Sequence, residues 1–224
     1  MRYFVGTDPP RPLRILVVDD HLMFADSLVR LLQLETDFDV LEPCVNATEA
    51  LQLLETSLPD LALVDFNLPD SDGVQLTRDL LARAPEMRVI MLTGLSDELV
   101  MLRAIEAGAS GFLTKDRAAT DLTDSLRLVA RGDPLITPEV FARVLARLPR
   151  HRTPPVSALS DREREVLQLM AEGLTTRAMA EHLFLSVNTV RNYSQAVLTK
   201  LGAHSKLEAV ALAVRSGIID PPSS

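Results

Sequence analysis

The first 131 residues alternate short apolar runs with amphipathic segments, and this alternation constrains the fold more than any other feature of the sequence. Five runs are apolar enough to be strands covered on both faces: Arg14–Val18, Val40–Val45, Leu61–Val64, Val89–Leu92 and Gly111–Leu113. The segments between them carry apolar residues at helical spacing: Phe24–Leu34, Thr48–Thr56, Gly73–Ala84, Asp97–Ala107 and Thr120–Ala130. Strands that alternate with helices predict an α/β fold, a doubly wound five-stranded parallel sheet.

The next segment, 132–156, is rich in proline. A short helix is predicted at Pro138–Leu148, since proline is tolerated in a first helical turn and Pro149 ends the helix. Pro149–Pro155 is typical of an extended, semi-rigid connection. We therefore expect a first domain at 12–131, a linker with a short helix at 132–156, and a second domain at 157–219.

Only helices are predicted in the second domain. Capping boxes at Ser160–Glu163 and Ser205–Glu208 mark two helix starts, and Gly173 and Gly202 stand where helices end. The four predicted helices are 160–172, 176–183, 187–201 and 205–216.

Composition excludes several classes of protein. Cys44 is the only cysteine, so the chain has neither an internal disulfide framework nor a cysteine-rich zinc site. No apolar run reaches the ~18 residues of a membrane span, and the first residues lack an apolar signal core. We expect a cytoplasmic protein that does not act in a membrane.

The net charge of −8 is unevenly distributed. Residues 1–150 hold 15 Lys/Arg against 24 Asp/Glu, whereas residues 151–224 hold 8 against 7. The chain as a whole is thus not a strongly basic nucleic-acid binder, but a local basic face on the second domain remains open.

Polar residues follow four of the apolar runs directly. In "LRILVVDDHL" the first run ends in Asp19 and Asp20; Asp65, Thr93 and Lys115 follow the third, fourth and fifth runs. Ligands of open parallel sheets bind at the carboxyl ends of strands. Neighbouring carboxylates repel by roughly 4 kcal/mol at an effective dielectric of 20, and a cation would offset that repulsion. Three carboxylates suit Mg²⁺, a lysine and a hydroxyl suit a transferring phosphoryl group, and an aspartate can be its nucleophile.

These residues, in this order, resemble the receiver domain of two-component response regulators over 13–131. The resemblance implies that Asp65 accepts the phosphoryl group and that Mg²⁺ is bound by Asp19, Asp20, Asp65 and the carbonyl of Asn67. It assigns Thr93 and Lys115 to the phosphate and Phe112 to the switch behind Thr93. Asp70 departs from a frequent glycine and adds a negative charge near the site. His21 is expected to face solvent at a helix start.

Residues 159–210 resemble the LuxR-type helix-turn-helix. The predicted helix at 187–201 has a core stripe that includes Val190, Tyr193 and Val197, and its other face is polar. By residue type alone that face is either a solvated surface or a recognition surface; the resemblance favours recognition of double-stranded DNA. The expected DNA contacts are Arg177, Asn188, Thr189, Arg191, Asn192, Gln195, Lys200 and Lys206.

Together these features identify the chain as a member of the NarL/FixJ subfamily of response regulators. We expect a DNA-binding transcription regulator, not an enzyme beyond its own phosphorylation and dephosphorylation, switched when a sensor histidine kinase phosphorylates Asp65. A homodimer is expected on activation or on DNA, through residues 97–116 or 205–216. The alternatives are a regulator that binds DNA independently of phosphorylation and, less favoured, an aspartate-dependent phosphatase.

Overall fold

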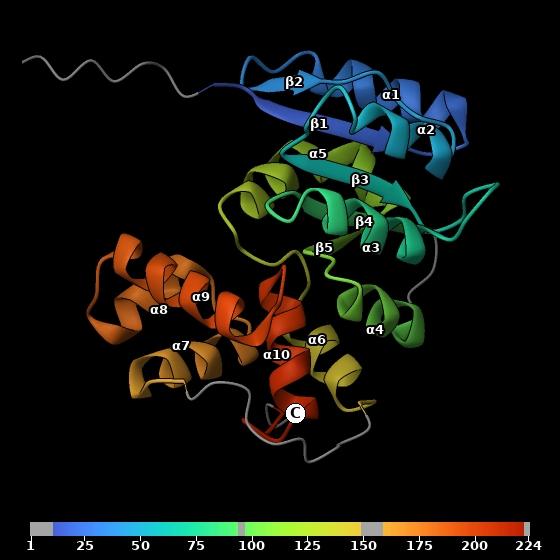
Figure 1. Ribbon diagram of the computed structural model, residues 1–224. Coiled ribbons are helices and arrows are strands. Elements are labelled where there is room, and N and C mark those ends of the chain that lie inside the picture. Colours follow the sequence, from blue (N-terminus) through green and yellow to red (C-terminus); the bar gives the residue numbers. More distant parts are fainter. Residues whose placement is uncertain (1–10, 94–96, 149–158, 222–224) are drawn as a thin grey trace, which may run out of the picture.

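A five-stranded parallel sheet organises the first part of the molecule (Figure 1). The structure is a computed structural model and describes residues 11–93, 97–148 and 159–221. The strand order is β2-β1-β3-β4-β5, so the order reverses beside β1 and the carboxyl ends of β1 and β3 flank the switch point. The strands are β1 (Leu13–Val18), β2 (Phe38–Val40), β3 (Leu61–Asp65), β4 (Arg88–Thr93) and β5 (Gly111–Thr114).

Five helices cover the two faces of this sheet. They are α1 (Leu22–Leu32), α2 (Ala47–Leu53), α3 (Gly73–Arg83), α4 (Glu98–Glu106) and α5 (Lys115–Ala130). Buried side chains of α1 and α5 pack on one face, and those of α2, α3 and α4 pack on the other. Both faces of the sheet are therefore dry, which is why its strands are almost wholly apolar. The predicted doubly wound fold is confirmed.

Several predicted boundaries differ from the observed ones, and two of these differences have a clear physical reason. The second strand is Phe38–Val40 instead of Val40–Val45, although Cys44 still donates its amide to Val17 at 2.9 Å. Pro43 has no amide hydrogen, so a continuous ladder cannot be maintained there. The fifth helix begins at Lys115, not at Thr120, because the Thr114 side chain caps it by accepting from the amide of Arg117.

The second part of the molecule is all-helical, as predicted (Figure 1). Its elements are α6 (Pro138–Leu145), α7 (Asp161–Ala171), α8 (Thr176–Leu183), α9 (Val187–Leu201) and α10 (Lys206–Arg215). Helix α6 ends three residues earlier than expected. The capping box at Ser160 and Glu163 is present, and Gly202 ends α9 with a left-handed backbone.

One apolar core joins the two parts. Met101, Leu102 and Ile105 of α4 belong to the same buried cluster as Phe141 of α6 and the core of α7 to α10. The proposed linker 132–156 therefore contains a helix that is packed, not a free spacer. The connection predicted at Pro149–Pro155 lies outside the described residues. No helix in the described part of the chain is long and apolar enough to cross a bilayer.

Candidate functional site

The polar residues that follow the strands meet at one edge of the sheet. Asp19 and Asp65 are almost fully buried there, at 0% and 3% exposure, and Thr93 is 5% exposed. Strand register explains this arrangement, because Asp65 pairs with Leu92 of β4, one residue before Thr93. We call Asp19, Asp20, Asp65 and Lys115 the acidic pocket.

Lys115 lies between the two buried carboxylates of the acidic pocket. Its Nζ donates to Asp19 Oδ2 at 2.7 Å and to Asp65 Oδ2 at 3.0 Å. Burial raises the pKa of Asp65; the hydrogen bond from Lys115 opposes this rise, and the charge of Asp19 adds to it. Burial disfavours the charged Lys115, but its hydrogen bonds to both aspartates outweigh burial and raise its pKa. One lysine thus serves two carboxylates, and an excess of negative charge remains.

The acidic pocket has the donor set of a divalent-cation site. Ligand atoms of Asp19, Asp20, His21 and Asp65 lie within 4.8 Å of one another. Three of them are carboxylate oxygens, which Mg²⁺ prefers, and Asp20 is open to solvent, which leaves room for bound water. The residues present therefore fit a hard divalent cation.

His21 is closer to this site than expected. Its side chain is 67% exposed, as a residue at a helix start should be, but Nδ1 lies 2.8 Å from Asp20 Oδ1 and 3.1 Å from Asp19 Oδ1. Nitrogen at that position is a weaker partner for Mg²⁺ than oxygen. We therefore assign His21 a contact with the carboxylates and no ligand role.

Asp70 does not add charge to the acidic pocket. Its carboxylate accepts from the amides of Ala47 and Thr48 at 2.9 and 3.0 Å, at the start of α2. These hydrogen bonds hold the pKa of Asp70 below its usual value. Asp70 is therefore a second cap for α2, a role that depends on contacts 22 residues away and has no local sequence signal.

Gly73 and Asn67 shape the chain after β3. A Cβ on Gly73 would overlap the backbone carbonyl of Asp65, so only glycine lets α3 begin this close to the strand end. Asn67 is exposed and forms an isolated bridge with Asp72. The bridge between Asn67 and Asp72 therefore closes the turn that follows Asp65.

Phe112 connects the acidic pocket to the helical domain. It lies on β5, is partly buried, and packs against the cluster under the sheet as well as the cluster shared by α4, α6 and α10. Its amide donates to Leu135 O at 2.8 Å, in the segment that leads to α6. A change in the position of Phe112 would therefore alter the packing in both parts of the molecule.

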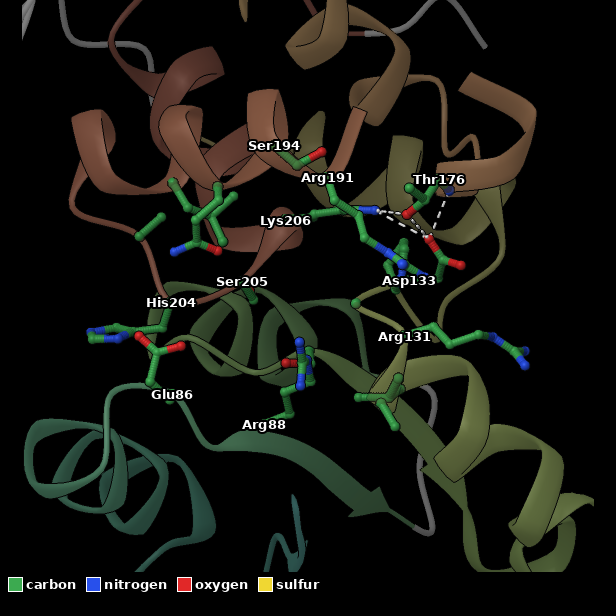
Figure 2. A pocket seen from close by; sticks show the side chains of 18 of the residues that line it. Glu86, Arg88, Arg131, Asp133, Thr176, Arg191, Ser194, His204, Ser205 and Lys206 are labelled. Carbon is green, nitrogen blue, oxygen red and sulfur yellow. Dashed lines mark hydrogen bonds and ion pairs between the residues drawn. The ribbon is translucent and has the colours of Figure 1, made fainter. Parts of the chain in front are cut away.

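The polar face of α9 is turned toward the first domain. Arg191, Asn192 and Gln195 are exposed but line a cavity of about 750 Å³ whose opposite wall includes Arg88 and Arg131 (Figure 2). Ser194 of α9 lines the same cavity, although only 6% of the residue is exposed. We call this space the interdomain cavity.

The predicted DNA contacts do not share one open face. Arg177, Asn188 and Thr189 lie outside the lining of the interdomain cavity. Lys200 donates to Glu163 Oε2 at 2.6 Å, within the capping box of α7. Lys206 has only 9% of its side chain exposed. In this arrangement Lys206 is withdrawn from solvent, whereas Lys200 keeps 35% of its side chain exposed beside Glu163.

Lys206 belongs to a buried cluster that sequence reasoning missed. Asp133 Oδ1 accepts from the amide of Thr176 at 2.8 Å, from the Thr176 hydroxyl, and from Lys206 Nζ at 3.1 Å (Figure 2). Asp133 follows α5, Thr176 begins α8 and Lys206 begins α10, so the cluster links three segments. We call it the interdomain latch. Nothing in the spacing of these residues signals their contact.

Further contacts fasten α4 to the helical domain. Glu98 at the start of α4 accepts from Arg143 at 3.0 Å and from Arg147 at 3.1 Å. Arg215 of α10 donates to Glu106 at 3.0 Å, and Ser205 Oγ donates to Ala109 O at 2.9 Å. The two faces expected to form a dimer, 97–116 and 205–216, thus pack on each other within one chain.

Comparisons with known proteins give two family matches. Residues 15–127 match the response regulator receiver domain, and residues 157–213 match the bacterial regulatory proteins of the luxR family. The chain is 35% identical over 212 residues to a protein of Mycobacterium tuberculosis described as the DNA-binding transcriptional activator DevR/DosR, with 94% of this chain and 98% of that protein covered.

Solved structures agree with the receiver match and with the overall fold. The receiver domain of the response regulator NarL from Mycobacterium tuberculosis is 31% identical, with a TM-score of 0.52 over 55% of this chain and 99% of that one. The RcsB response regulator of Salmonella typhimurium aligns over 88% of this chain and 97% of its own, with a TM-score of 0.55. At 22% identity the RcsB match supports the fold alone.

Proposed function

The chain belongs to the response regulators that join a receiver domain to a LuxR-type DNA-binding domain, and we propose that it regulates transcription through a phosphorylation switch at Asp65. The observation that carries this proposal is the acidic pocket, in which Asp65 and Asp19 share Lys115 at 3.0 and 2.7 Å. The excess negative charge there is compatible with a bound cation. Once the cation is bound, the site is also compatible with a phosphoryl group.

Phosphorylation would take place at a carboxylate oxygen of Asp65. That oxygen attacks the phosphorus of a phosphohistidine on a sensor kinase; the P–O bond forms, the P–N bond breaks, and the kinase imidazole leaves. In this proposal Lys115 pairs with the phosphoryl oxygens and Thr93 donates its hydroxyl to them. Mg²⁺, held by Asp19, Asp20, Asp65 and the carbonyl of Asn67, would neutralise the charge that develops on the phosphoryl group.

The closed arrangement would be the resting state. Arg191, Asn192 and Gln195 line the interdomain cavity, on the side that is turned toward the receiver domain. Lys206 is buried in the interdomain latch. A recognition helix must enter a major groove about 12 Å wide with phosphates on either side, which requires that the receiver domain move away. These side chains therefore cannot line the closed cavity and contact DNA at the same time.

Phe112 supports a route from the phosphate to this closure. It packs on both apolar clusters, and its amide holds Leu135 just after the latch residue Asp133. Movement of Thr93 toward a phosphoryl group would let Phe112 turn inward and would disturb the packing of α4 on α6 and α10. Opening would expose 97–116 and 205–216, the surfaces that we expect to pair in a homodimer on DNA. Such coupling requires that the phosphoryl group favour the open state.

This proposal keeps the domain limits of 12–131, 132–156 and 157–219, and it places the working protein in the cytoplasm, where a kinase and DNA are both accessible. An aspartate-dependent phosphatase is not favoured, because both matched families are regulators and together they span most of the chain. Binding of DNA without phosphorylation remains the alternative to be tested.

The test compares wild type with Asp65→Asn in binding to genomic DNA fragments, each with and without acetyl phosphate and Mg²⁺. We expect the phosphodonor to strengthen binding by wild type only, and the selected fragments to reveal the operator. Equal binding by both proteins under all conditions would overturn the switch and leave DNA binding intact. Binding by neither would contradict the role of α9.

A further inference from the structure

The interdomain cavity gathers positive charge from both domains. Arg88 at the start of β4 and Arg131 at the end of α5 come from the receiver side, and Arg191 and Lys206 come from the helical side (Figure 2). Two carboxylates line the same space, and one of them, Asp133, already accepts from Lys206 and Thr176. The cavity is therefore lined by an excess of cations in a protein whose net charge is −8.

The guanidinium groups of this cavity have few partners. Within the described residues, Arg88 and Arg131 have neither a side-chain hydrogen bond nor an ion pair, and Arg191 makes only a 3.4 Å contact with Asn188. Arg88 is partly buried; desolvation lowers its pKa, and the charges of Glu86 and Asp60 oppose that shift without a hydrogen bond or an ion pair among the residues that the structure describes. Partly buried arginines are ordinarily paired, because a desolvated guanidinium loses hydrogen bonds to water.

The cations of the two domains also act on one another. Burial lowers the pKa of Lys206; Asp133 opposes that shift, while the charges of Arg88 and Arg191 lower the pKa further. Arg88 belongs to the receiver domain and Arg191 to α9, so like charges face each other across the domain interface. An anion between them would replace repulsion by attraction on both sides.

The size of the cavity indicates what kind of anion would fit. Its volume of about 750 Å³ lies in the range of small-molecule sites and is far larger than one phosphate ion. Asn192, Gln195 and Thr199 of α9 add amide and hydroxyl groups to the wall, which suit the hydroxyl groups and ring nitrogens of a larger molecule. Arginine is the side chain best matched to a phosphate, through two parallel N–H donors.

We propose that the interdomain cavity binds a small phosphorylated molecule of nucleotide size, bridged between Arg88 of the receiver domain and Arg191 of α9. The ligand holds the two domains closed, because it contacts both at once. It also occupies Arg191, which the recognition helix needs for DNA. This site is separate from the acidic pocket, so the protein has a second input, one that opposes activation.

The test is direct and needs neither DNA nor a phosphodonor, so it is independent of the switch at Asp65. Binding of inorganic pyrophosphate and of ATP is measured by isothermal titration calorimetry on the full chain, in EDTA and at constant ionic strength. EDTA keeps metal out of the acidic pocket, whose carboxylates then repel both probes. Arg88→Gln removes the receiver-side cation of the proposed bridge, and Arg191→Gln removes the one on α9.

We expect one pyrophosphate per chain and a dissociation constant raised about tenfold or more by either substitution, a change of roughly 1.4 kcal/mol per factor of ten. Arg30→Gln is the matched control, because Arg30 is exposed on α1 and lies outside the cavity lining; it should leave binding unchanged. Tighter binding of ATP than of pyrophosphate would identify a nucleotide as the source of the phosphate, and equal binding would point to another phosphorylated metabolite.

Three results would overturn the site. The first is no binding of either probe at millimolar concentration. The second is equal weakening in Arg30→Gln, which would show a general charge effect. The third is loss in only one of Arg88→Gln and Arg191→Gln, which would exclude a bridge between the domains. Arg131→Gln, at an exposed residue of the same wall, replaces Arg88→Gln should the latter fail to fold.

Discussion

The acidic pocket and the interdomain latch are both buried clusters of aspartate and lysine, and their charge balance differs. In the acidic pocket, Asp19 and Asp65 share Lys115; burial raises the pKa of Asp65, and Asp19 adds to the rise. In the interdomain latch a single carboxylate meets a single lysine. There the hydrogen bonds from Thr176 and the charge of Lys206 outweigh burial, and the pKa of Asp133 falls below its usual value of 3.8.

This difference separates a reactive cluster from a structural one. Two carboxylates on one lysine leave a net negative charge, which is compatible with a divalent cation. One carboxylate on one lysine, with a hydroxyl between them, is balanced in charge and has its hydrogen bonds satisfied. The latch holds the domains together, and the pocket is where chemistry can occur.

The largest effect is expected from Asp65→Asn. The amide cannot form an acyl phosphate at neutral pH, so incorporation from acetyl phosphate should be lost entirely. Intact-mass spectrometry after incubation with acetyl phosphate and Mg²⁺ measures this directly. Asp121→Asn, on the exposed surface of α5, is the matched control and should be phosphorylated like wild type; a phosphorylated Asp65→Asn protein would place the nucleophile elsewhere.

The next effect is expected from Asp133→Asn on domain closure. The substitution leaves Lys206 buried without a counter-charge, and removal of one partner from a buried pair typically costs about 3–5 kcal/mol. About 3 kcal/mol would shift the balance between closed and open forms by roughly 100-fold. Small-angle scattering should show a larger radius of gyration, and amide exchange in α8 and α10 should accelerate.

A double substitution sharpens the same test. Adding Lys206→Met to Asp133→Asn removes the stranded charge and should recover much of the closure, so the two effects should not add. If the double variant opens as far as the sum of the single ones, the latch does not act as a pair.

The pH dependence of closure follows from the lowered pKa of Asp133. A carboxylate with a depressed pKa stabilises the closed state above its usual pKa of 3.8, and this contribution is lost as the pH falls through the lowered value. Closure in wild type should therefore weaken at acid pH by more than in Asp133→Asn. Scattering measured along a pH series in both proteins checks the difference.

A smaller effect is expected from Asp20→Asn. Asp20 supplies an exposed carboxylate beside buried Asp19, so its loss should weaken Mg²⁺ binding by about tenfold or more while Asp65 stays in place. Phosphorylation should then require a higher Mg²⁺ concentration, and saturating Mg²⁺ should restore it. An unchanged Mg²⁺ requirement would remove Asp20 from the metal site.

The smallest effect is expected where an aspartate pairs with an arginine and both side chains are exposed to solvent. Asp121 accepts from Arg117 at 3.1 Å on the surface of α5, and both side chains are about half exposed. Asp121→Asn should lower the free energy of unfolding by no more than about 0.5 kcal/mol. Chemical denaturation measures the free energy of unfolding of this variant and of Asp133→Asn. The difference between the two losses shows how much of the stability from the latch depends on burial.

The sequence predicted the elements because their signals are local. Apolar runs gave the strands, 3.6-residue spacing gave the helices, and capping residues such as Ser160 gave helix starts. The prediction failed where it passed over a local signal: Pro43 shortens β2, and Thr114 caps α5, which begins five residues before the predicted start. The acidic pocket was also accessible from sequence, because the carboxyl ends of parallel strands must meet at one edge.

By itself, therefore, the sequence determined the sheet, the helical second domain and which residues gather around Asp65. Only the tertiary structure decided that α9 faces the receiver domain and that Lys206 is held by Asp133 instead of being open to DNA. Asp133 and Lys206 are 73 residues apart, and neither belongs to a periodic pattern. Their contact depends on how α4, α6 and α10 share one apolar core, which no local rule of sequence encodes.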